Sequence, residues 1–183
     1  MEKYRLKNKS LKIKESEETF KVSQFNCDGL SKKLSEVKLH LYTGKPDLLC
    51  SCETWKKKQE PRFVGYKALW KHRIGREKGG LAILVREDIR AKEIVLQQFN
   101  RGKLECQAIE INTHLGAVRI LNGYNVDNLT VGELSFYIQQ LGDRYIIVGD
   151  YNAHSPMWDR RNRSNPTGLT IEDTMNRFSL FNK

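Results

Sequence analysis

The sequence predicts a mixed α/β (α+β) domain built around one hydrophobic core. Short apolar runs rich in β-branched residues recur along the chain, among them residues 81–85 and 145–148, and such runs are typical of strands. Between two of the expected strands, apolar residues recur at helical spacing, at Leu30, Leu34, Val37 and Leu41. A chain of 183 residues is long enough for a single domain with a sizeable core.

The chain begins with a polar, charged segment. Residues 1–19 hold six Lys or Arg residues by position 14, followed by an acidic patch, and they contain few apolar residues. This composition predicts a basic flexible tail, so that the folded domain covers residues 20–183.

The first expected βαβ unit begins with a strand at residues 20–25 and a turn at 26–29. The helix that follows ends near Gly44 and Pro46, and a second strand covers residues 47–52, with Glu53 directly after it. A helix between two strands is a crossover connection, so the two strands run parallel. Asn26 and Glu53 are therefore expected at the same edge of one sheet.

Basic residues dominate the segment from 56 to 78, interleaved with Phe63, Tyr66 and Trp70. This pattern is as typical of a nucleic-acid surface as of the rim of a core. Further strands are predicted at 81–85, 94–98, 104–112 and 117–125, and a helix at 131–141. The close spacing of the middle strands favours antiparallel hairpins.

The segment from 145 to 158 has the pattern of a chemical site. Residues 145–148 are expected to form a strand buried on both faces, and Asp150, Asn152 and His154 follow at alternating positions. In extended chain this spacing puts the three side chains on one face. A carboxylate and an amide side by side suit phosphate chemistry. The same residues also occur in an Asp-x-Asn turn that caps a strand and has no chemical role. A loop then includes residues 165–168, before a helix from Thr170.

Composition limits the classes of partner and the compartment that we expect for this protein. The formal net charge of +10 favours an anionic partner. No apolar run approaches the length of a membrane span, and the N-terminus lacks the apolar core of a signal peptide. The four cysteines, at positions 27, 50, 52 and 106, lack zinc-finger spacing and are read as reduced, partly buried thiols. We therefore expect an intracellular, unsecreted protein that binds no membrane.

Five polar signals occur in a fixed order along the chain. They are Asn26, Glu53, Gly79-Gly80, Tyr124 and the run from Gly149 to Asn152. Together they resemble the endonuclease/exonuclease/phosphatase superfamily, and the resemblance implies a four-layer sandwich of two mixed β-sheets flanked by helices. Asn152-Ala153-His154 with Pro156 and Trp158, followed by a basic loop, is most similar to the apurinic-type endonuclease domain of non-LTR retrotransposons, which precedes a reverse transcriptase.

The resemblance implies a role for each matching residue. Glu53 would bind a catalytic Mg²⁺, with Mn²⁺ as a substitute, and Asn26 would lie beside the metal and hold its ligands and the scissile phosphate. Tyr124 would donate to the phosphate, Asp150 would orient or activate the attacking water, and Asn152 would stabilise the transition state. Contacts to the substrate are expected from His154, Trp158 and Arg163. The implied partner is DNA, bound by a monomer that uses no small-molecule cofactor and whose ancestral activity requires nuclear access.

The sequence also departs from the family pattern. Family members carry a final Ser-Asp-His run that supplies the base, and no such run occurs in these 183 residues. We therefore expect a domain incomplete at its C-terminus, with the last strands missing. Loss of the general base costs on the order of 10²–10⁴ in rate, so weak or absent activity is expected.

Three functions follow from these observations. The first is a Mg²⁺-dependent DNA endonuclease that nicks one strand for target-primed reverse transcription. The second is a catalytically inactive remnant that keeps the fold and binds DNA. The third is a phosphomonoesterase of the same superfamily, which the Asn152-Ala153-His154 run with Trp158 disfavours. A generic α/β domain with turn residues at its strand ends is the plain alternative.

Overall fold

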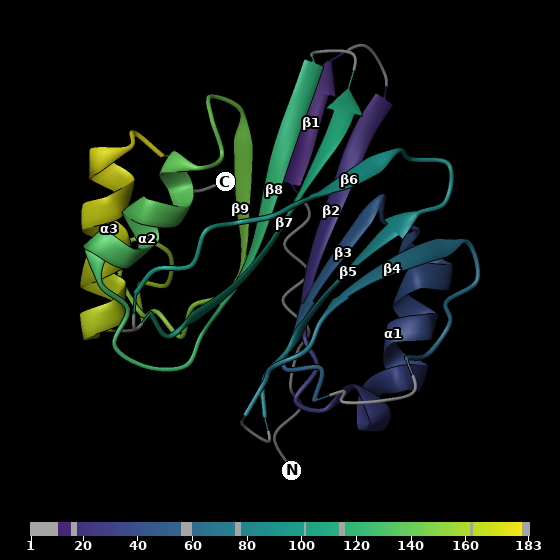
Figure 1. Ribbon diagram of the computed structural model, residues 1–183, viewed down its shortest axis with the longest axis horizontal. Helices are drawn as coiled ribbons and strands as arrows, with labels where there is room; N and C mark the ends of the chain where they lie inside the picture. Colours follow the sequence, from purple (N-terminus) through teal and green to yellow (C-terminus); the bar gives the residue numbers. More distant parts are fainter. Residues whose placement is uncertain are drawn as a thin grey trace.

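Two mixed β-sheets pack face to face in a computed structural model that describes residues 11–15, 18–55, 60–75, 78–100, 102–113, 116–161 and 163–180 (Figure 1). The first sheet has the order β1-β2-β3-β5-β4. Its strands are β1 (Leu11–Glu15), β2 (Glu18–Asn26), β3 (Leu48–Cys52), β4 (Tyr66–Lys71) and β5 (Leu81–Arg86). The second sheet has the order β6-β7-β8-β9. Its strands are β6 (Ala91–Ile94), β7 (Leu104–Thr113), β8 (Gly116–Asn125) and β9 (Tyr145–Asp150).

Each sheet contains one parallel pair among antiparallel ones. In the first sheet β2 and β3 run parallel, connected through α1 (Leu30–Gly44). In the second sheet β8 and β9 run parallel, connected through α2 (Val131–Gln139). A third helix, α3 (Pro166–Arg177), follows β9. The two crossovers bring the carboxyl ends of four strands to the edges where a site can form.

Helices cover the two outer faces, so the molecule has four layers. Figure 1 shows α1 beside the first sheet on one side of the molecule, and α2 and α3 together beside the second sheet on the other. The alternation of side chains along β3 explains this layering, because Leu48 and Cys50 pack between the sheets whereas Leu49 packs against α1. The predicted sandwich of two mixed sheets with flanking helices is confirmed.

Five expectations need correction. The expected tail includes strand residues, since β1 pairs with β2 from Leu11↔Val22 to Glu15↔Glu18, and the alternation of apolar and basic residues at 11–14 is the strand signal that composition obscured. Residues 1–10 and 16–17 lie outside the described residues. The structure also contains β4, in a segment expected to be basic loop. Its aromatic residues pack beside α1, Lys67 is exposed, and the half-buried Lys71 donates through Nζ to the Cys106 carbonyl at 2.6 Å.

The strand expected at 94–98 is β6, which ends at Ile94. Beyond it the backbone leaves the sheet and bonds α2 side chains instead: Gln97 N–H donates to Gln140 Oε1 at 2.8 Å, and Phe99 N–H to the Tyr137 hydroxyl at 3.3 Å. The expected strand at 145–148 is β9, but its side chains are half-buried. In the described sheet β9 has a neighbour on one side only.

The last helix begins earlier than Thr170. Asn165 caps α3 by accepting from Gly168 N–H, and Pro166 occupies the first helical turn. Asparagine followed by proline is a helix start as well as a turn signal, which explains the error in the expected loop at 165–168.

The cysteines lie in the core, as their positions predict. All four are buried and unpaired. Burial raises the pKa of Cys27 and of Cys50 to about 12. Among the described helices, none combines the length and the apolar character needed to cross a membrane.

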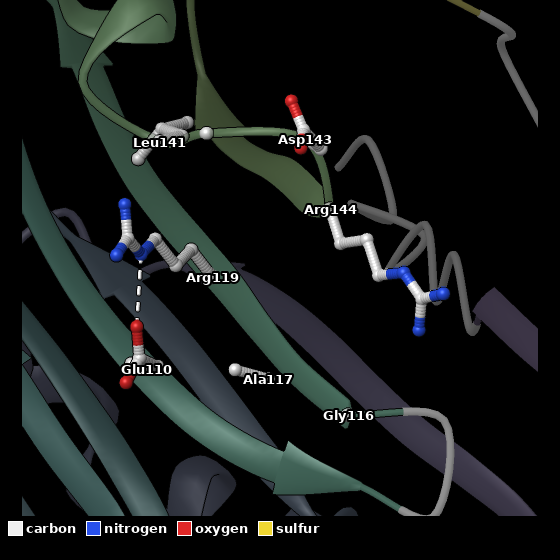
Figure 2. Close-up of a pocket in the computed structure, with 8 residues that line it drawn as sticks. Glu110, Gly116, Ala117, Arg119, Leu141, Asp143 and Arg144 are labelled. Atoms are coloured by element: carbon white, nitrogen blue, oxygen red, sulfur yellow. Dashed lines mark hydrogen bonds and ion pairs between the residues drawn. The ribbon is translucent and has the colours of Figure 1, made fainter.

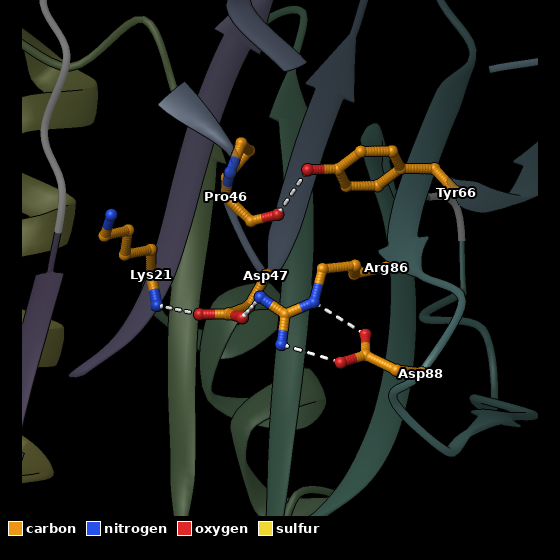
Figure 3. A network of polar contacts seen from close by, with 6 residues as sticks. All are labelled: Lys21, Pro46, Asp47, Tyr66, Arg86 and Asp88. Atoms are coloured by element: carbon orange, nitrogen blue, oxygen red, sulfur yellow. Dashed lines mark hydrogen bonds and ion pairs between the residues drawn. The ribbon is translucent and has the colours of Figure 1, made fainter. Parts of the chain in front are cut away.

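At the end of the sandwich away from Asn26 and Asp150, charged side chains are neutralised in pairs. Arg86 forms ion pairs with Asp47 and with Asp88 (Figure 3). The backbone N–H of Lys21 also donates to Asp47 Oδ2 at 2.5 Å. A surface pocket at the start of β8 and β9 contains a second such pair, in which Arg119 Nε donates to Glu110 Oε2 at 2.9 Å (Figure 2). Asp47, Asp88 and Glu110 at this end therefore have arginine partners.

Candidate active site

Polar residues from both sheets meet at the other end of the sandwich. Asn26 ends β2 opposite Cys52, and Glu53 follows β3 directly, so the two lie at one edge as predicted. In the second sheet Tyr124 of β8 pairs in register with Asp150 of β9. The four residues come from four strands, and side-chain hydrogen bonds connect them.

Asn26 holds two carboxylates together. Its Nδ2 donates to Glu53 Oε1 at 2.8 Å and to Asp150 Oδ2 at 2.8 Å, while its Oδ1 accepts from Asp28 N–H at 3.0 Å. An amide group has two N–H donors, so both are used on carboxylates. Asn26 therefore orients the carboxylates, whereas the resemblance also implied a contact to the phosphate.

Glu53 is fixed in a strained backbone conformation. Its φ of 53° lies in the left-handed region, as does the φ of 52° at Trp55. The Glu53 carbonyl accepts from Gly29 N–H at 2.9 Å, and Trp55 Nε1 donates to Glu53 Oε2 at 3.3 Å. Non-glycine residues with positive φ cluster at functional sites, where the surrounding contacts hold them.

Tyr124 supplies a neutral donor. It is only 8% exposed, and burial together with the nearby charge of Glu53, to which its hydroxyl is hydrogen-bonded, raises its pKa above the ordinary value. The hydroxyl therefore stays protonated at neutral pH. Its single O–H is used on the Glu53 carboxylate, so the donation to phosphate that the resemblance implies requires this bond to be exchanged.

The Gly79-Gly80 loop supports the segment after Glu53. Thr54 N–H donates to the Gly80 carbonyl at 3.2 Å and Trp55 N–H to the Gly79 carbonyl at 2.9 Å. This loop is fixed in turn by Glu105 of the second sheet, whose Oε2 accepts from Gly80 N–H at 2.7 Å. The two sheets are thus coupled through backbone next to the site.

Glu105 is a residue that sequence reasoning missed. It forms an ion pair with Arg73, and both side chains are mostly buried, at 16% and 15% exposed. Burial raises the pKa of Glu105, against the opposing effects of Gly80 N–H and Arg73. Nothing in the pattern of β7 singled it out, because its partners lie 25 and more residues away in sequence.

The loop after β9 folds back on the end of β8. Asn152 Nδ2 donates to the Asn125 carbonyl at 2.7 Å, and Asn125 Nδ2 donates to the Tyr151 carbonyl at 3.0 Å. Asn152 N–H also donates to Asp150 Oδ1 at 3.0 Å. With a φ of 50°, Asn152 turns the chain back at once. Asp150 and Asn152 are thus held in one unit.

Asn165 connects this loop to α3. Its side chain accepts from His154 N–H at 3.0 Å and donates to the Asn152 carbonyl at 2.8 Å. His154 itself is exposed, and Trp158 Nε1 donates to the Ala153 carbonyl at 3.3 Å. Arg163 is exposed in the same loop. The three expected substrate contacts therefore share the loop beside the carboxylates, and the Asn165 tether, which sequence reasoning missed, determines the position of that loop.

The donor set fits a hard divalent cation. Neither Glu53 nor Asp150 has an Arg or Lys at ion-pair distance within the described part of the chain, in contrast to the carboxylates at the far end. Two carboxylates joined by one amide leave their mutual repulsion uncompensated. Within that same part of the chain no group of three or more His, Cys, Asp or Glu residues could hold a metal. Mg²⁺ is commonly bound by one or two carboxylates, with water and phosphate oxygens as the other ligands.

Comparison with known proteins identifies the family and supports the fold. The sequence profile of the endonuclease/exonuclease/phosphatase family matches residues 23–182. Two proteins of Drosophila melanogaster are similar to this chain. The probable RNA-directed DNA polymerase from transposon X-element is 28% identical over 152 residues, which are 80% of this chain and 16% of that protein. The RNA-directed DNA polymerase from mobile element jockey is 23% identical over 163 residues, 86% of this chain and 17% of that protein. The chain therefore spans about a sixth of the length of these relatives.

Solved structures show the same fold. The endonuclease domain of TRAS1, a telomere-specific non-LTR retrotransposon, superposes with a TM-score of 0.66 at 18% identity, covering 86% of this chain and 71% of that one. An AP endonuclease from Archaeoglobus fulgidus gives a TM-score of 0.62 at 17% identity, covering 85% and 70%. The predicted resemblance is confirmed, and the chain belongs to the endonuclease/exonuclease/phosphatase family.

Proposed function

We propose that this chain hydrolyses phosphodiester bonds in DNA with the help of Mg²⁺ and nicks one strand, at a low rate because these 183 residues contain no Ser-Asp-His run to supply the base. The activity would serve target-primed reverse transcription in a retrotransposon. The observation that carries the proposal is the Asn26 amide, which holds Glu53 and Asp150 together across the two sheets. The names of the relatives, which are RNA-directed DNA polymerases of mobile elements, support a nucleic-acid substrate. So does the net charge of +10.

Each residue has a role that its contacts allow. Asp150 orients the attacking water or accepts a proton from it. Its carboxylate is fixed for this role by hydrogen bonds from the Asn26 side-chain amide and from the backbone N–H of Asn152. The protonated Tyr124 hydroxyl donates to a phosphoryl oxygen once it exchanges its hydrogen bond to Glu53. Asn152 uses one N–H on the Asn125 carbonyl, and its second N–H stabilises the extra negative charge of the transition state.

Glu53 would hold the metal, with Asp150 beside it. When bound, Mg²⁺ would neutralise charge on the phosphate oxygens and polarise them for attack. The chain's own contribution is to keep the two carboxylates at a fixed separation before the metal arrives, which lowers the cost of reorganisation.

The test is a nicking assay on supercoiled plasmid with Mg²⁺. The 183-residue protein is compared with Glu53→Gln, which removes the charge at the site, and with Glu87→Gln, an exposed glutamate in the loop after β5. Nicking by the wild type and by Glu87→Gln, lost in Glu53→Gln, supports the proposal and excludes a contaminating nuclease.

Two results contradict it. A wild-type protein that binds DNA but leaves the plasmid supercoiled is a binding fold without activity. A protein that releases phosphate from a soluble monoester while ignoring plasmid DNA is a phosphomonoesterase.

A further inference from the structure

Beside the two carboxylates, an aromatic ring holds two lysines from different segments of the chain. Lys32 Nζ lies 5.3 Å from the centroid of the Trp55 ring, and Lys78 Nζ lies 5.1 Å from it. Lys32 is in the first turn of α1, Trp55 follows Glu53, and Lys78 precedes the Gly79-Gly80 loop. We call these three residues the Lys-Trp-Lys cluster.

The ring of the cluster is held in place from several directions. A Cβ on Gly29 would lie 2.7 Å from Trp55 Cε3, so only glycine lets the ring approach the start of α1 this closely. The backbone of Trp55 is bonded to Gly79, and its Nε1 is bonded to the Glu53 carboxylate at 3.3 Å. Both ammonium groups therefore contact the same ring that is hydrogen-bonded to Glu53, the candidate metal ligand.

The cations of the cluster have no acidic partner among the residues whose structure is described. Other lysines on this surface are neutralised, as Lys33 is by Glu36 at 2.9 Å and Lys103 by Asp127 at 2.7 Å. Among the described residues, Lys32 and Lys78 have no carboxylate at ion-pair distance. The first turn of α1 also contains no acidic residue. Within the part of the chain that the structure describes, two exposed positive charges thus have no paired carboxylate next to a site with two negative ones.

These charges suit a phosphate group better than a stacked base. The ring contacts both ammonium groups and the Gly29 backbone, so these neighbours occupy the surface that a base would need. An ammonium group on an aromatic ring keeps its N–H donors free for an anion. If the chain cleaves DNA as proposed above, the phosphates flanking the scissile one pass close to the carboxylates.

We propose that Lys32 and Lys78, held on Trp55, bind a backbone phosphate of the DNA strand next to the phosphate that is cleaved. This inference rests on the proposed function for its substrate. It adds a binding subsite formed by α1 and the loop before β5. Such contacts position the strand without reading its sequence.

The test measures binding without cleavage. A short fluorescently labelled DNA duplex is titrated with protein in EDTA at several salt concentrations, and fluorescence anisotropy gives the dissociation constant at each. The wild type is compared with Lys32→Gln/Lys78→Gln. The matched control is Lys38→Gln/Lys92→Gln, which removes the same charge from exposed positions on α1 and β6.

Each phosphate contact releases condensed counterions from the DNA. The slope of the logarithm of the association constant against the logarithm of the salt concentration therefore has a magnitude of about 0.9 per phosphate contact. We expect the slope of Lys32→Gln/Lys78→Gln to be smaller in magnitude by about 0.9, as the loss of one phosphate contact requires, and the slope of the control to equal that of the wild type. Equal slopes in the two double variants would overturn the inference.

The binding assay separates this inference from the proposed function. If the slope falls as expected while the plasmid stays supercoiled in the nicking assay, the subsite stands and the hydrolytic activity fails. If the plasmid is nicked but the slope is unchanged, the activity stands and the subsite fails. A wild-type protein without measurable affinity for DNA in this assay would overturn the subsite, and the nicking assay would decide the activity separately.

Discussion

Asn26 and Asp150 are separated by 124 positions in the sequence, yet the Asn26 amide donates a 2.8 Å hydrogen bond to the Asp150 carboxylate. The same amide group donates to Glu53. One side chain thus joins the first sheet to the second at the end where phosphate chemistry is proposed. Five predictions follow from the structure.

Mg²⁺ should stabilise the fold through Glu53. A cation that binds the native state between two repelling carboxylates raises the unfolding temperature with metal concentration. We expect this rise in the wild type and in Glu87→Gln, measured by differential scanning fluorimetry with and without Mg²⁺. Glu53→Gln should show no rise, and an equal rise in that variant would rule out Glu53 as a ligand.

Gly149→Ala should destabilise the protein strongly. A Cβ at Gly149 would overlap the Gly123 carbonyl of the neighbouring strand, and the φ of 140° is strained for any other residue. We expect a loss of about 2–4 kcal/mol in the free energy of unfolding, measured with urea.

Gly132→Ala serves as the matched control for Gly149→Ala. Gly132 lies in α2, and a Cβ there would meet nothing within 4 Å. Alanine favours a helix over glycine by about 0.5–1 kcal/mol, so this variant should be as stable as the wild type or slightly more stable. Similar losses in the two variants would contradict the close packing of β8 on β9.

Asn165 should act both as a helix cap and as a tether. Asn165→Ala removes the acceptor of Gly168 N–H and His154 N–H and should cost about 1 kcal/mol in urea unfolding. Asn165→Asp keeps that acceptor but loses the N–H donated to the Asn152 carbonyl. The aspartate variant should therefore unfold close to the wild type while nicking more slowly. Equal nicking by the two proteins would show that the tether is not needed.

The four thiols should be unreactive in the native state. Burial raises the pKa of Cys27 and Cys50 to about 12, and burial also raises the pKa of Cys52 and Cys106. Iodoacetamide at pH 8 should leave the native protein unmodified and add to all four cysteines in urea, as mass spectrometry would detect.

The same shifts predict a loss of stability in alkali. Because the native thiols keep their protons above the ordinary pKa of 9.0, the unfolded state binds fewer protons there. The contribution to stability is fully present below pH 9 and is lost as the pH rises toward about 12. Urea unfolding at pH 7.5 and at pH 10 checks the sign, and greater stability at pH 10 would contradict the burial of these groups.

Much of the local structure was predictable because local periodicity determined it. Leu30, Val37 and Leu41 recur at helical spacing, and they form the buried face of α1. Asn26 and Glu53 could be placed at one edge because a helical crossover makes their strands parallel. The errors arose where composition obscured periodicity, as with β1 and β4, or where one signal had two meanings, as at Asn165.

The sequence by itself determined most of the elements, the family resemblance and the identity of the polar residues at the strand ends, because each depends on neighbours a few positions apart. Only the tertiary structure decided that the ends of both sheets meet, that the Asn26 amide donates to two carboxylates, and that Glu105 supports the Gly79-Gly80 loop. Those relationships depend on how two sheets pack face to face. The partners are brought together by burial of side chains between the layers, which no local spacing encodes.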